Sequence, residues 1–135
     1  MRLSHLLVLS LATACSATLY SRYAGPAAGT PDEVYSCVQG QLKTLGYVRA
    51  QYDSAAKWYL AKKIVKDQVS SGLYRHTIEM LETKVKVSNE GEPTLDITAR
   101  TFEEFATARG EDQQERKASD RVQIDARTLG KACAK

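Results

Sequence analysis

The sequence has few of the residues that would mark a repetitive or unfolded chain. It contains only three prolines and eight glycines among 135 residues, too few for a collagen-like or low-complexity protein. No apolar run reaches the roughly 18 residues that a membrane-spanning helix needs. Charged residues make up 26% and hydrophobic residues 43%, with a net charge of +3. This balance predicts a single globular domain rather than a disordered chain.

Familiar catalytic motifs are also missing. The sequence contains no Gly-x-Ser-x-Gly, no His-Glu-x-x-His and no glycine-rich phosphate loop. His76 is the only histidine beyond the N-terminal segment, and no Cys/His cluster has the spacing of a metal site. Glu103 and Glu104 are adjacent in a predicted strand, so they point to opposite faces and do not share a proton. We therefore expect a non-catalytic protein without metal or cofactor; an enzyme that uses His76 is the alternative.

The N-terminal segment has the three-part order of a secretory signal peptide. Arg2 precedes an apolar stretch from Leu6 to Leu11, and small residues follow at positions 12–14. The apolar stretch is too short to serve as a permanent anchor. We expect residues 1–14 to direct export and then to be removed.

A cysteine stands directly after this segment. The run Leu11-Ala12-Thr13-Ala14-Cys15 resembles the lipobox of bacterial lipoproteins, with Ala12 where that family usually has Leu or a similar aliphatic residue. The resemblance implies that the Cys15 thiol receives a diacylglycerol, that the new N-terminus is acylated with a chain such as palmitate, and that the membrane is a partner. Ser16, in place of Asp, implies an outer-membrane location facing the periplasm. Ordinary cleavage at the same bond, giving a soluble periplasmic or secreted protein, is the alternative.

The cysteine count fits this interpretation. Three cysteines leave an odd one in an exported protein. If Cys15 carries lipid, Cys37 and Cys133 remain, and an oxidising compartment favours a disulfide between them. Such a bridge contributes up to roughly 4.7 kcal/mol in the chain-entropy model. Two buried free thiols are the alternative.

Hydrophobic periodicity predicts a helix at each end of the remaining chain. The first, from Pro31 to Leu45, begins at a Thr30–Glu33 capping box and stops at Gly46. The last is capped by Ser119 and carries Cys133 on its apolar stripe.

Alternating patterns predict four strands between these helices. They cover residues 47–52, 58–65, Tyr74 to Val87 with a bulge near Leu81 and Glu82, and Thr94 to Phe105. Two polar stretches, Lys66 to Gly72 and Thr107 to Ala118, are expected to be loops, with a frayed helix as the second choice for the latter.

These elements predict an α+β domain over residues 30–135. It would have an antiparallel sheet of about four strands with an N-terminal and a C-terminal helix packed on one face. Residues 15–29 are expected to form a lipidated tether. Docking of Tyr20 and Tyr23 on the domain, or an added edge strand, is the alternative for that segment.

One strand combines lysines with aromatic residues, and its candidate partner-binding residues are Lys57, Trp58, Tyr59 and Lys62. Nucleic acid is not an expected partner, because export separates the two and removal of Arg2 leaves 18 minus 16, or only +2. We expect a periplasmic binding or accessory module that contacts an envelope protein or a cell-wall component. A carrier of lipid or another small ligand, with a cavity between helices and sheet, is the alternative.

Overall fold

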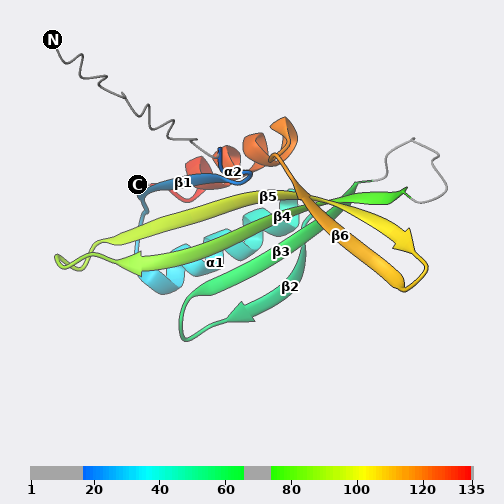
Figure 1. Ribbon diagram of the computed structural model, residues 1–135. Helices are drawn as coiled ribbons and strands as arrows, with labels where there is room; N and C mark the ends of the chain where they lie inside the picture. The colour runs from blue at the N-terminus through cyan, green and yellow to red at the C-terminus, as the bar shows by residue number, and fades with distance from the viewer. Residues whose placement is uncertain (1–16, 66–73, 135) are drawn as a thin grey trace, which may run out of the picture.

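The computed structural model describes residues 17–65 and 74–134. The predicted signal segment, the lipobox-like run with Cys15 and the expected loop from Lys66 to Gly72 lie outside the described residues. In chain order the elements are β1 (Ser21–Pro26), α1 (Pro31–Thr44), β2 (Val48–Asp53), β3 (Trp58–Val65), β4 (Tyr74–Val87), β5 (Pro93–Thr107), β6 (Gly110–Arg116) and α2 (Asp120–Ala132) (Figure 1).

The described strands form one antiparallel sheet. Its order is β1-β5-β4-β3-β2, and β6 also pairs with β5. β1 lies along residues 94–99 of β5, whereas β6 lies along residues 101–107, so the two short strands share one edge. In Figure 1 the β5–β6 hairpin projects from one end of the sheet, and the turn between β4 and β5 projects from the other.

The expected four-stranded α+β domain is wrong. The protein is mostly β, with 52% of the described residues in strands and 25% in helices, and the first helix is preceded by a strand. The extra strands, β1 and β6, come from the segments predicted to be a tether and a loop. Neither segment has the alternating apolar residues from which a strand is predicted. Each is a strand because it pairs with β5.

β1 replaces most of the expected tether. The chain is already attached to the domain at Leu19, whose carbonyl oxygen accepts a hydrogen bond from the Ala118 amide at 2.8 Å. Beyond β1, Ala27 is buried and forms an isolated bridge with Ala134. The favoured tether is therefore corrected to the alternative, an added edge strand.

β6 forms without a single large apolar side chain. Two ion pairs across the β5–β6 hairpin support this strand. The Arg100 guanidinium lies 2.9 Å from the Glu115 carboxylate, and the Arg116 guanidinium lies 2.8 Å from the Glu103 carboxylate. These pairs lie between neighbouring strands, where opposite charges contribute a few tenths of a kcal/mol to about 1 kcal/mol each.

The predicted helix caps are confirmed. The Thr30 hydroxyl accepts from the Glu33 amide at 3.2 Å, and the Glu33 carboxylate accepts from the Thr30 amide at 2.7 Å, completing the capping box. Gly46 follows the end of α1 with φ of +86°, a conformation that glycine adopts without strain. At α2 the Ser119 hydroxyl accepts from the Val122 amide at 3.1 Å.

Both helices pack on the same face of the sheet, with α1 over β3 and β4 and α2 over β5 and β1. The most deeply buried side chains between these layers are Val34, Val38, Leu42, Leu81, Ile97, Val122 and Leu129. A buried carboxylate, Glu79 at 2% exposed, ties the start of α2 to β4, because the Ser119 hydroxyl donates to it at 2.8 Å.

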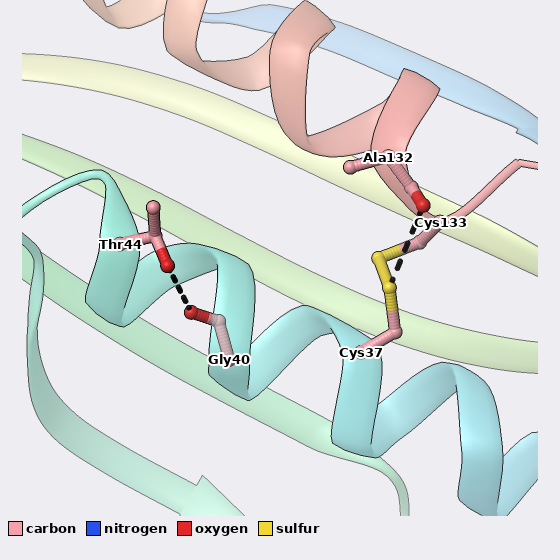
Figure 2. The surroundings of a disulfide bond; sticks show 5 residues. All are labelled: Cys37, Gly40, Thr44, Ala132 and Cys133. Atoms are coloured by element: carbon pink, nitrogen blue, oxygen red, sulfur yellow. Dashed lines mark hydrogen bonds between the residues drawn. A yellow bond between two sulfur atoms is a disulfide. The ribbon is translucent and has the colours of Figure 1, made fainter.

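A disulfide between Cys37 and Cys133 joins the two helices, which confirms the predicted pair (Figure 2). The two Cα atoms are 5.9 Å apart although the residues are 96 positions apart in the sequence. The Cys37 sulfur also lies 3.7 Å from the Ala132 carbonyl oxygen. A disulfide sulfur has no proton to donate, so this is a packing contact.

The bulge expected near Leu81 and Glu82 is wrong. β4 pairs with β5 in continuous register from His76 to Val87, and the irregularity lies between Tyr74 and His76. Ile78 is buried although it faces away from the helices, because it lies directly between Ile64 and Phe102 on the neighbouring strands. Apolar residues therefore occur at both odd and even positions of β4, because this strand has apolar contacts on both faces of the sheet.

Candidate functional site

The predicted partner-binding residues do not form one surface. Trp58 and Lys62 lie on the helix-free face of the sheet, whereas Tyr59 points to the side of the helices, as alternation along β3 requires. Lys57 precedes the strand in a turn with φ of +53° and is paired with Asp32 of α1 at 2.7 Å.

The helix-free face is densely paired. The Trp58 indole donates to the Glu82 carboxylate at 2.8 Å. Asp96 accepts from the Arg22 guanidinium and also from the Lys86 ammonium at 2.9 Å. The hydrogen bond from Arg22, followed by that from Lys86, lowers the pKa of Asp96 to about 2. Most of the charge on this part of the face is thus already satisfied within the protein.

A cleft of about 810 Å³ lies at one end of this face, near β2, β3 and β6. Ile64 and Ile78 line it together with His76, Glu104 and Gln113. Glu104 is 8% exposed, and its carboxylate lies 3.1 Å from the His76 Nε2 atom and accepts from the Gln113 side-chain amide at 3.2 Å. A histidine paired with a carboxylate resembles part of a catalytic triad.

The described lining of this cleft contains no serine, threonine or cysteine that could act as a nucleophile beside His76. Within residues 17–65 and 74–134, no three His, Cys, Asp or Glu side chains are grouped to bind a metal ion. The His76–Glu104 pair links β4 to β5, since the two residues are directly paired across the strands.

A second cleft, of about 540 Å³, lies between α1 and β2. Its lining residues are Ser36, Gln39, Gly40, Lys43, Tyr47, Val48, Arg49 and Tyr59. This α1–β2 cleft thus contains two cations and two tyrosines, and none of its described lining residues is a carboxylate.

The tyrosines of this region are held in place by neighbouring rings and cations. The Tyr59 ring meets that of Tyr35 edge to face, with centroids 6.2 Å apart. Burial, the largest cause, raises the pKa of Tyr59. The Lys63 ammonium lies 5.2 Å from the centre of the Tyr47 ring, whose hydroxyl donates to the Asp125 carboxylate at 2.9 Å. Burial and then that hydrogen bond strongly raise the pKa of Tyr47.

Arg49 completes the wall formed by β2. Its guanidinium lies 4.5 Å from the centre of the exposed Tyr52 ring. Such a contact orients the guanidinium while leaving its N–H groups available to a ligand.

Most of this cleft does not belong to the predicted site. The predicted residues include Tyr59 but not Tyr47, Arg49, Lys43 or Gly40. The usable signal was Gly40, which interrupts the interior of a strongly predicted helix. The remaining residues come from three different elements, and their proximity depends on the packing of α1 on the sheet.

A third hollow, of about 270 Å³, lies between β1 and α2 and is mainly apolar. It opens at the margin of the core, as the other two clefts do. Between the helices and the sheet, Val38, Leu81 and Leu129 are fully buried and belong to one continuous cluster. The hollow beside α2 is thus the place where a small apolar ligand would lie between a helix and the sheet, and the carrier stays an alternative prediction.

No protein-family model and no curated protein matches the sequence. None of the helices in the described part of the chain is long and apolar enough to cross a membrane. The candidate site therefore depends on the geometry of this chain alone.

Proposed function

We propose that this chain is an exported bacterial lipoprotein, anchored through Cys15 in the outer membrane and facing the periplasm, where it acts as a non-catalytic binding module. The observation that carries the proposal is the Cys37–Cys133 disulfide. Structural disulfides persist in oxidising compartments outside the cytosol. The bridge uses two of the three cysteines and leaves the third, Cys15, at the end of the lipobox-like run.

The proposed anchor sets how far the domain stands from the bilayer. Four residue steps separate Cys15 from Leu19. Leu19 is the first residue attached to the domain, through the hydrogen bond from the Ala118 amide to its carbonyl oxygen. At no more than 3.6 Å per residue, this spacer spans at most about 14 Å. The lipid would therefore hold the domain against the membrane surface. Each buried methylene contributes roughly 0.8 kcal/mol, and two or more acyl chains give stable attachment.

A binding role is supported by the uncovered surfaces. Both the helix-free face and the α1–β2 cleft combine cations with apolar or aromatic side chains. An anchored module with such surfaces is suited to contact an envelope protein or a cell-wall component.

Substitution of Cys15 tests the anchor. In a Gram-negative host the native chain should fractionate with membranes, and its intact mass should correspond to a polypeptide that starts at Cys15 and carries acyl chains. Cys15→Ala should release the protein into the soluble periplasm without acyl mass. Thr13→Ser, which keeps a small residue, is the matched control and should remain in the membrane fraction. A native chain that keeps Met1, or that starts at Cys15 without fatty acid, contradicts the proposal.

A further inference from the structure

The α1–β2 cleft contains a glycine that the fold does not require. Gly40 lies in the interior of α1, where glycine is less favourable than alanine. Its φ is not positive, and a Cβ atom added there would meet nothing within 4 Å. Figure 2 shows Gly40 about one turn from Cys37, with its carbonyl oxygen accepting from the Thr44 hydroxyl at 3.0 Å. The missing side chain therefore serves the open space of the cleft rather than helix packing.

The chemistry of the lining indicates what the space accepts. Lys43 and Arg49 favour an anionic group, since charge-assisted hydrogen bonds to carboxylates are among the strongest in proteins. Ser36 and Gln39 offer neutral donors and acceptors suited to hydroxyl groups. Tyr47 is buried, but the half-buried Tyr59 ring offers an apolar surface that the C–H face of a sugar ring can cover.

The neighbouring hollows differ in ways that favour this cleft. The cleft on the helix-free face shares Arg49 and also contains Lys62 and Lys63, but two carboxylates, Glu104 and Glu111, lie among these cations. The β1–α2 hollow is smaller and mainly apolar. The α1–β2 cleft is bordered by β2, all six residues of which are exposed. An extended chain could therefore enter and leave along the edge of the sheet.

We propose that the α1–β2 cleft binds an anionic glycan, a polysaccharide whose sugars carry carboxylate groups. Arg49 and Lys43 contact the carboxylates, Tyr59 packs against a sugar ring, and Gly40 leaves the room for it. This inference rests on the proposed function in one respect, the location of the ligand, because an exported and anchored domain encounters such polymers in the cell envelope.

Calorimetric titration tests the cleft directly. The purified, oxidised full chain with Cys15→Ala is titrated with an octamer of galacturonic acid and, separately, with neutral maltooctaose. Saturable binding is expected for the acidic octamer and not for the neutral one. Arg49→Gln should weaken binding at least about tenfold, the loss expected for a hydrogen bond to a charged group. Arg109→Gln removes the same charge from the exposed β5–β6 turn and should leave the affinity unchanged.

A second variant separates blocked binding from misfolding. Gly40→Gln fills the cleft with a good helix former, so binding should be lost while the urea midpoint is kept or raised. The proposal is overturned if the acidic octamer does not bind saturably, or if Arg109→Gln weakens binding as much as Arg49→Gln. It is also overturned if hexaglutamate or phosphatidylglycerol vesicles bind with the same dependence on Arg49. Failure of lipidation at Cys15 would appear only in the fractionation and would leave the calorimetric result standing.

Discussion

Removal of the disulfide should cost a large part of the stability of this domain. The bridge joins Cys37 and Cys133, 96 positions apart, and links two helices that pack on the same face of the sheet. In the chain-entropy model a loop of this size corresponds to about 4.7 kcal/mol of lost freedom in the unfolded state. A domain of this size has a total stability of about 5–15 kcal/mol. We expect the double variant Cys37→Ala/Cys133→Ala to lose about 2–5 kcal/mol.

Urea unfolding at pH 7, followed by circular dichroism, measures this loss. With an m value of about 2 kcal/mol per molar urea, the midpoint should fall by roughly 1–2.5 M. Cys15→Ala leaves the bridge intact and is the control, whose midpoint should not move. In that background, alkylation should add two tags only after reduction. A loss below about 1 kcal/mol in the double variant would refute the argument that the bridge acts by restricting the unfolded chain.

Two further predictions follow from particular residues. Gly40→Ala should raise the free energy of unfolding by about 0.5–1 kcal/mol, because alanine is the better helix former and its Cβ meets no neighbour; an unchanged or lower urea midpoint would contradict this. Asp96 has a pKa of about 2 in the folded protein against 3.8 ordinarily, so its ion pairs with Arg22 and Lys86 stabilise the fold above about pH 4 and are lost as the pH falls towards 2. Asp96→Asn should remove that part of the pH dependence in thermal unfolding between pH 2 and 5, and parallel curves for the two proteins would exclude the assignment.

Elements determined by local interactions were predictable from the sequence. α1 was predicted to within one residue because its capping box and its glycine stop involve residues within a single turn of each helix end. The bounds of β4 were also correct, since its ends coincide with polar segments. The disulfide followed from counting cysteines and from placing Cys37 and Cys133 near the apolar stripes of two helices.

Elements determined by distant partners were not predictable in this way. β1 and β6 consist mostly of small or charged residues, and their strand conformation depends on the free edge that β5 offers. The predicted surface around Trp58 and Tyr59 divides between two faces, because neighbouring residues of a strand point to opposite sides of the sheet.

The sequence by itself determined the helix boundaries and the cysteine pair, because each depends on neighbouring residues or on simple counting. Export by the N-terminal segment stays a prediction. Tertiary structure alone decided the number of strands and the two clefts. Arg49, Tyr59 and Gly40 belong to different elements, and their meeting depends on how α1 packs beside an edge strand. Contacts between such distant positions leave no periodic trace in the sequence, so packing was needed to reveal the candidate site.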